Sequence, residues 1–136
     1  MDHELRLKRV YEPYELADGY RILVDRLWPR GIKKEAAHLD EWAKEITPST
    51  EIRRLYHQGE MPFEGFSQAY LEELESNEAA EDFVHNCSEQ LKVQNVTLVY
   101  AAKNEQENHA LVCREWLKRK MYMDEHCPHI YMEKHL

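Results

Sequence analysis

Three segments of the chain carry the hydrophobic pattern of β-strands. Residues 5–11 begin with leucines that alternate with basic residues, as on a strand with one buried face. Residues 20–25 contain a short apolar run, and residues 96–102 form a longer apolar run with β-branched side chains. About eight residues separate the first two strands, whereas a parallel crossover usually needs about a dozen. The spacing therefore permits either a hairpin or a reduced crossover.

Apolar residues recur at helical spacing in four segments between the second and third strands. The first predicted helix covers residues 39–46 and ends before a Pro-Ser pair. Ser49, or the threonine after it, can cap a short second helix that runs through Tyr56. Regular apolar stripes predict two longer helices, over residues 63–74 and 80–91.

A last helix is predicted after the third strand. Asn104 is its candidate N-cap, and Glu107 stands at the reciprocal position of a capping box. This helix is expected to run to about Lys120, leaving residues 121–136 as a mixed tail. The order strand, strand, helices, strand, helix predicts a single compact α/β domain over residues 1–136, with a small sheet flanked by helices.

The composition fits one globular domain and narrows the classes of partner. The 136 residues are 43% hydrophobic and 32% charged, with a formal net charge of −8. An acidic chain is a poor general binder of nucleic acid, because that affinity comes mainly from neutralising phosphates. No segment approaches about eighteen consecutive apolar residues, so no membrane span is expected.

The cysteines and the N-terminus favour a cytoplasmic protein. Cys87, Cys113 and Cys127 are widely spaced and odd in number, which fits a reducing compartment better than a disulfide framework. The start Met1-Asp2-His3-Glu4 lacks the basic and then apolar pattern of a signal peptide.

Neither a cofactor nor a metal ion is expected. The chain has four glycines and contains no Gly-rich phosphate loop. Histidines and a cysteine gather in the tail at His126, Cys127, His129 and His135. Cys127 and His129 are too close for the usual zinc spacings, and no second ligand pair accompanies them.

The first candidate site follows the second strand, in the string Asp25-Arg26-Leu27-Trp28-Pro29-Arg30-Gly31. Arg26 and Arg30 can each grip a phosphate or carboxylate with two parallel hydrogen bonds. Trp28 offers a flat apolar face, and Asp25 occupies the strand end, where catalytic carboxylates are common. In the alternative interpretation, Asp25 pairs with one of the arginines as a structural clamp and Trp28 is part of the core. Both interpretations stay open.

The second candidate site follows the third strand. Lys103 precedes the predicted helix, whose free N–H groups and dipole favour anions. Asn108 and His109 lie on its first turns, and Tyr100 could supply a hydroxyl from the strand. A histidine there can be a proton-transfer group or simply a packed side chain. If the two strands run parallel in one sheet, both loops reach the same edge, where α/β sheets bind ligands.

These blocks resemble the YeaO-like branch of the family known as domain of unknown function 488. The resemblance spans about residues 5–118 and implies a mainly parallel sheet, which favours the reduced crossover; it supplies no established activity. A related branch has Cys-His-Arg where this chain has Asn108-His109-Ala110, so only His109 is retained of that motif. The matching stretches are Arg9-Val10-Tyr11, residues 21–31 and 42–49, Tyr70 with Glu73-Leu74, residues 96–103 and residues 108–110.

The leading hypothesis is a pocket for a small phosphate or carboxylate, with Asp25 and His109 as a candidate acid/base pair. Its rival is a non-enzymatic module that binds a nucleotide or a protein partner through the same cleft. A third possibility is that Asp25, the two arginines and Glu73 form only a structural ion network. The pattern does not indicate whether the chain is an enzyme or what its oligomeric state is. The candidate ligand-binding residues are Arg26, Trp28, Arg30, Tyr100, Lys103 and Asn108.

Overall fold

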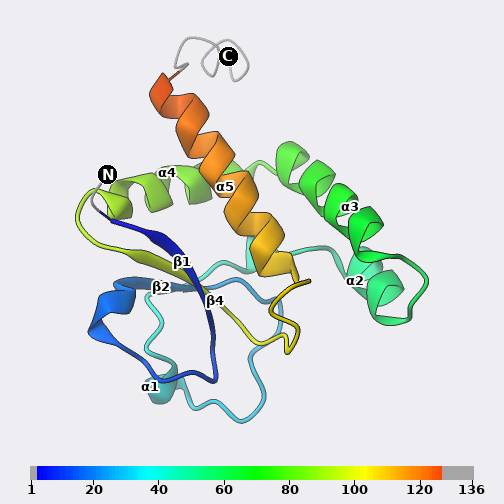
Figure 1. Cartoon of the computed structure of the whole chain (residues 1–136), viewed down its shortest axis with the longest axis horizontal. Coiled ribbons are helices and arrows are strands. Elements are labelled where there is room, and N and C mark those ends of the chain that lie inside the picture. Colours follow the sequence, from blue (N-terminus) through cyan, green and yellow to red (C-terminus); the bar gives the residue numbers. More distant parts are fainter. Residues whose placement is uncertain (1–2, 127–136) are drawn as a thin grey trace.

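A four-stranded sheet lies at the centre of the computed structural model, which describes residues 3–126 (Figure 1). Its strands, in spatial order, are β1 (Leu5–Arg9), β4 (Val96–Tyr100), β2 (Tyr20–Leu23) and β3 (Glu41–Trp42). All three pairings are parallel. Because β4 lies between β1 and β2, the short connection after β1 is a crossover and not a hairpin. The expected mainly parallel α/β fold is thus confirmed.

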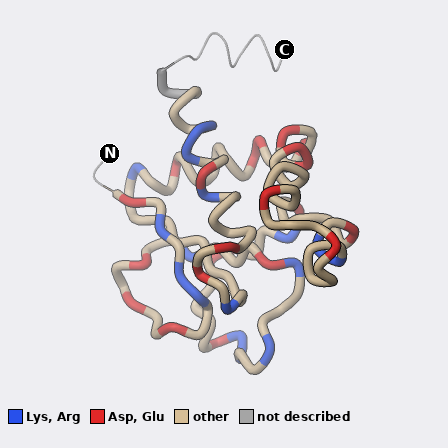
Figure 2. The backbone as a smooth tube through the Cα atoms, turned by 45° about the vertical axis from the view of Figure 1, so that its right-hand side comes forward, with Lys and Arg blue, Asp and Glu red and all other residues tan. Residues whose placement is uncertain are grey.

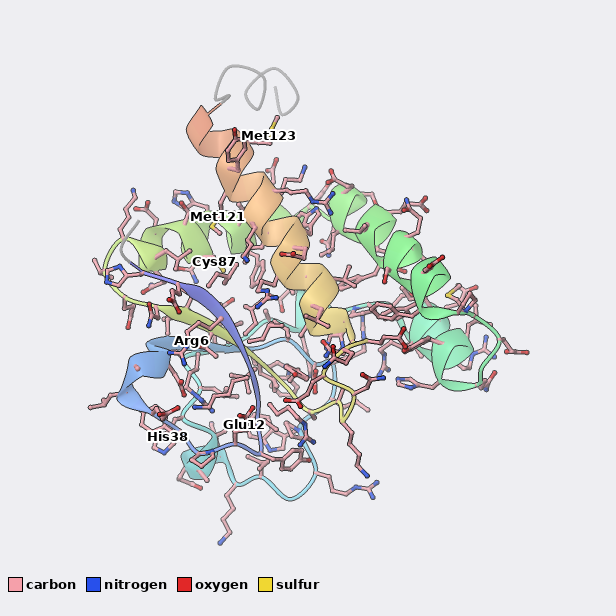
Figure 3. All side chains as sticks on the ribbon, in the orientation of Figure 1. Arg6, Glu12, His38, Cys87, Met121 and Met123 are labelled. Atoms are coloured by element: carbon pink, nitrogen blue, oxygen red, sulfur yellow. The ribbon has the colours of Figure 1, made fainter. Side chains whose placement is uncertain are left out.

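Two helices, α4 (Ala79–Leu91) and α5 (His109–His126), cover one face of the sheet, and α3 (Phe63–Ser76) packs against α5. The side chains that alternate toward them from the strands are fully buried at Ile22, Val96 and Leu98. Cys87 lies between α4 and the sheet (Figure 3). The helical stripes read from the sequence are confirmed in α3 and α4, whose buried residues are Phe66, Tyr70, Leu74, Ala80, Phe83, Val84, Cys87 and Leu91.

Loops cover the opposite face, together with the 3₁₀ turn η1 (Leu16–Asp18) and the short helix α1 (Lys34–Ala37). They bury charges there. The fully buried Asp18 carboxylate contacts Lys8 Nζ at 3.1 Å and Arg21 Nη1 at 2.7 Å. Arg21 also donates to the carbonyl of Ala37 in α1. Paired charges therefore tie the β1–β2 crossover and α1 to the sheet.

The pKa values of this buried cluster follow from its geometry. Burial alone would raise the pKa of Asp18, but the N–H of Glu15 and the charges of Lys8 and Arg21 outweigh it and lower that pKa. Burial would likewise lower the pKa of Lys8, but Glu15 and Asp18 outweigh it and raise that pKa. Both groups are therefore charged at neutral pH.

The reduced crossover depends on a glycine. Gly19 has φ 66° and ψ −127°, a backbone conformation that side chains disfavour. A Cβ on Gly19 would lie 2.1 Å from the carbonyl oxygen of Asn95. That same oxygen accepts the N–H of Tyr20 at 2.9 Å, so the chain turns directly against the start of β4.

The helix predicted over residues 39–46 is wrong. This segment forms the edge strand β3, followed by the 3₁₀ turn η2 (Lys44–Ile46). The N–H of Ala43 bonds to the carbonyl of Leu23, and the Trp42 indole donates to the carbonyl of Asp25 at 2.7 Å. Pairing with β2 thus overrides a helical apolar stripe.

The short helix α2 (Thr50–His57) begins as predicted, since the Ser49 side chain accepts the N–H of Ile52. The start predicted for the last helix is wrong. The Asn104 side chain accepts two N–H groups, those of Gln106 and Glu107, but it caps only a turn within the loop.

The last helix instead begins at His109, after Asn108, whose side chain accepts the N–H of Leu111. It continues to His126, past the end expected near Lys120. The tail residues Cys127, His129 and His135 lie outside the described residues. Within residues 3–126, none of the helices is both long and apolar enough to cross a membrane.

Candidate functional site

The loops that follow β2 and β4 meet at the carboxyl edge of the sheet, because these strands are adjacent and parallel. A cleft of about 630 Å³ opens there. Its walls are the segment after β2, the loop before α5, and α2 with the start of α3. Figure 1 shows α2 and the beginning of α5 on the same side of the molecule. The two loops predicted to share an edge therefore line one cleft.

Asp25 and His109 are in contact inside this cleft. Oδ1 of Asp25 lies 2.8 Å from Nε2 of His109, with 14% and 17% of the two side chains exposed. The other carboxylate oxygen accepts the N–H of Ala101 at 3.0 Å, which fixes Asp25 against the end of β4. The contact with His109 is electrostatic, since Oδ1 has no partner in hydrogen-bond geometry among the described residues.

The surroundings of His109 define where its proton sits. Nε2 also lies 3.0 Å from the carbonyl oxygen of Val24, in hydrogen-bond geometry. A carbonyl and a carboxylate can only accept, so Nε2 carries a hydrogen. Nδ1 is then the ring nitrogen that is able to take up or release a proton while the Val24 hydrogen bond is kept.

Three cationic side chains line the cleft, in a chain with a net charge of −8. Arg26 is braced by the carbonyls of Pro48 and Thr47, at 3.3 and 3.5 Å. Lys103 is exposed on the loop before α5, and Arg53 reaches the cleft from α2. Arg53 Nε is buried and has no hydrogen-bond partner within the described part of the chain. Two carboxylates, Asp25 and Glu107, also line the cleft.

An aromatic wall forms another part of the cleft. Tyr56 stacks on Phe66, with ring centroids 4.8 Å apart and an interplanar angle of 24°. Leu27 and Pro48 add apolar surface to the cleft. Burial, helped by the charge of Glu107, raises the pKa of Tyr56, so its hydroxyl stays protonated at neutral pH.

Sequence reasoning missed the contribution of α2. Arg53, Tyr56 and His57 occupy positions i, i+3 and i+4 of this helix and all line the cleft. Their spacing places the three side chains on one face of the helix, which the sequence alone could show. The sequence does not indicate that this face would line a cleft with the loop before α5. Acidic residues recur along the neighbouring α3 (Figure 2), so the basic face of α2 contrasts in charge with the helix beside it.

Of the residues predicted from sequence, Asp25, Arg26, Lys103, Asn108 and His109 line the cleft. Asn108 is buried there as a structural group. Its amide oxygen caps α5 and its amide nitrogen donates to the carbonyl of Asn104 at 2.8 Å.

The cleft lining does not include three other predicted residues: Trp28, Arg30 and Tyr100. Trp28 packs edge-on against Trp42 and donates to the carbonyl of Ile32. Arg30 is exposed, and its carbonyl accepts the Tyr11 hydroxyl. Tyr100 is 3% exposed, and its pKa is raised, chiefly by burial.

The structural-network alternative included Glu73, whose carboxylate accepts the N–H of Ser49 at 2.9 Å and so serves the start of α2. Among residues 3–126, no group of three or more His, Cys, Asp or Glu side chains is arranged to hold a metal ion. Cys113 is fully buried, and burial raises its pKa to about 12 despite the opposing effect of the nearby Tyr70 hydroxyl. A thiol so protonated is a poor nucleophile at neutral pH.

Comparison with known proteins agrees with the resemblance seen in the sequence. The model of the "Inactive DUF488-N3 subclade" matches residues 4–131. The chain is 51% identical to the uncharacterised protein YeaO of Escherichia coli over 114 residues, which cover 84% of this chain and 96% of YeaO.

It is also 35% identical to the uncharacterised protein Rv3073c of Mycobacterium tuberculosis over 113 residues, which cover 83% of this chain and 92% of that protein. No solved structure gives a significant match. The chain therefore belongs to the DUF488 family, as a YeaO-like member of its DUF488-N3 subclade.

Proposed function

We propose that the cleft binds a small anion, a phosphate or a carboxylate, and that the protein acts by binding it without chemically changing it. The observation that carries the proposal is Arg53. Arg53 lines the cleft, and its buried Nε lacks an acceptor among the described residues. A buried donor without a partner is costly, and a small shift of the guanidinium toward an anion in the cleft would satisfy it.

The charge balance of the cleft supports this proposal. Arg26, Arg53 and Lys103 outnumber the two carboxylates that share the cleft. A guanidinium recognises phosphate or carboxylate oxygens through paired hydrogen bonds. Arg26, held by two carbonyls, is pre-positioned, so little conformational entropy is lost when it meets a ligand.

Binding is favoured over catalysis by one further observation. The subclade to which the chain belongs is described as inactive. The free, buried thiols of Cys87 and Cys113 suit a reducing compartment, and we place the protein in the cytoplasm.

The Asp25–His109 contact favours acid/base catalysis as a second candidate function. A carboxylate beside Nε2 stabilises the imidazolium that forms when Nδ1 takes a proton. In this case His109→Gln would abolish turnover of a phosphorylated or carboxylated metabolite. Under the leading proposal, no turnover is detected with the wild-type protein.

A calorimetric titration of the protein with inorganic phosphate tests the leading proposal. We expect saturable binding that Arg53→Gln weakens about tenfold, because a charge-assisted hydrogen bond is lost. Arg54→Gln is the matched control, since Arg54 is the next residue of α2 and is exposed. Equal binding by the wild type and Arg53→Gln would contradict the proposal, as would an equal loss in both variants.

A further inference from the structure

We infer that the anion bound by the cleft carries a flat aromatic body, which lies along Tyr56 while its charged end meets Arg53. This inference rests on the proposed function and specifies its ligand class. The class is an aromatic phosphate ester or an aromatic acid, and nucleoside monophosphates are among its members.

The size of the cleft is the first argument. Its volume of about 630 Å³ falls in the range of about 300–1,000 Å³ typical of pockets for organic ligands. Inorganic phosphate alone would leave most of this space to water. A site built only for phosphate would instead enclose the ion with donors.

The aromatic wall is the second argument. Tyr56 is half-buried, and its ring is held by Phe66 at a centroid distance of 4.8 Å. Phe63 supports Tyr56 from a centroid distance of 5.9 Å. A ring fixed in this way offers a preformed face for offset stacking, with little loss of side-chain freedom when a ligand ring docks.

The distribution of charge in the cleft determines the orientation of the ligand. Arg53 lies one helical turn before Tyr56 on the same face of α2. Glu107 faces the cleft near Tyr56, since its charge contributes to the raised pKa of that tyrosine. A second negative charge at this end would be repelled. The ligand is therefore anionic at the Arg53 end and neutral at the Tyr56 end.

Calorimetric titration of the full chain with four probes tests the inference. The probes are inorganic phosphate, ribose 5-phosphate, phenyl phosphate and adenosine 5′-monophosphate. Stacking on a ring predicts that the last two bind at least about fivefold more tightly than the first two. A preference for the adenosine compound over phenyl phosphate would identify a nucleotide site, whereas equal affinity of these two would identify a general aromatic-anion site; both results support the inference.

A pair of variants isolates the ring of Tyr56. Tyr56→Phe keeps the ring and is expected to keep the preference, whereas Tyr56→Leu is expected to abolish it while inorganic phosphate still binds. Circular dichroism checks that both variants fold. Phosphate binding with no preference for aromatic probes would overturn this inference alone. Failure of all four probes to bind would overturn the proposed function with it.

Discussion

The carboxylate of Asp25 lies 2.8 Å from Nε2 of His109 and also accepts the N–H of Ala101. One side chain just after β2 thus contacts both the residue that follows β4 and the first residue of α5. The same contact places a negative charge inside a cleft that we propose binds anions. The charge of Asp25 would therefore weaken the binding of an anion, while its contacts stabilise the loops that line the cleft.

Replacing Asp25 by asparagine separates these two effects. Asp25→Asn removes the charge but keeps an oxygen for the N–H of Ala101, and we expect phosphate to bind about threefold more tightly. The free energy of unfolding should fall by about 1 kcal/mol, because the electrostatic contact with His109 is lost. Calorimetry and urea unfolding measure the two changes. Weaker binding of phosphate by Asp25→Asn would show that the carboxylate takes part in holding the ligand.

The buried cluster around Asp18 predicts a definite pH dependence. The lowered pKa of Asp18 contributes stability that is complete above its ordinary value of 3.8 and is lost as the pH falls through the lower folded pKa. The raised pKa of Lys8 contributes stability that is complete below 10.5 and is lost as the pH rises through the higher folded pKa.

Asp18→Asn tests this dependence by leaving the buried Arg21 without a carboxylate and Lys8 with Glu15 alone. We expect a loss of about 3 kcal/mol in the free energy of unfolding at pH 7. Urea unfolding at pH 7 and at pH 3 should show a smaller acid sensitivity in the variant than in the wild type. The same acid sensitivity in both proteins would mean that Asp18 is not the titrating group.

The close approach of Gly19 to β4 predicts a large effect of a single methyl group. Gly19→Ala would place a Cβ 2.1 Å from the backbone oxygen of Asn95, and the crossover would have to shift. We expect a destabilisation of about 3 kcal/mol in thermal or urea unfolding. Gly59→Ala is the matched control, since Gly59 has φ 76° and nothing within 4 Å of the added Cβ. It should cost only the backbone strain of about 1 kcal/mol.

Burial predicts that two cysteines do not react in the folded protein. Cys87 and Cys113 are both 0% exposed, and burial raises the pKa of each thiol well above its ordinary value of 9.0. In a Cys127→Ala background, a disulfide reagent at pH 8 should label no thiol in the native protein and both thiols after unfolding. Rapid labelling of Cys113 under native conditions would contradict its place in the core.

The sheet and the long helices could be predicted because local pattern and tertiary packing agree there. The apolar stripes of α3 and α4 are the faces that the structure buries, and the apolar runs of β1 and β4 form adjacent strands of the sheet. The segment 39–46 was mispredicted because its pattern also fits an edge strand. Hydrogen bonds from Trp42 and Ala43 to the β2 segment favour the strand over the helix. These are contacts with a distant segment, which a local sequence pattern cannot indicate.

The candidate site was predicted in part for the same reason. Asp25 and His109 follow strands that topology brings together, so their meeting followed from the parallel sheet. Arg53 and Tyr56 lie on a helix whose position depends on packing against α3, which the sequence pattern does not fix. Arg30 was assigned to the site by its charge, yet the loop turns it into solvent.

The order of the strands also determines how the sheet ends at its two sides. On one side, β3 is two residues long and gives another chain almost no backbone to pair with. On the other side, β1 carries two partly exposed arginines, Arg6 and Arg9, while the Lys8 between them is buried and paired with Asp18 and Glu15. A second copy pairing with β1 would bring like charges together. Shortness on one side and charge on the other thus protect the protein from edge-to-edge aggregation at high concentration.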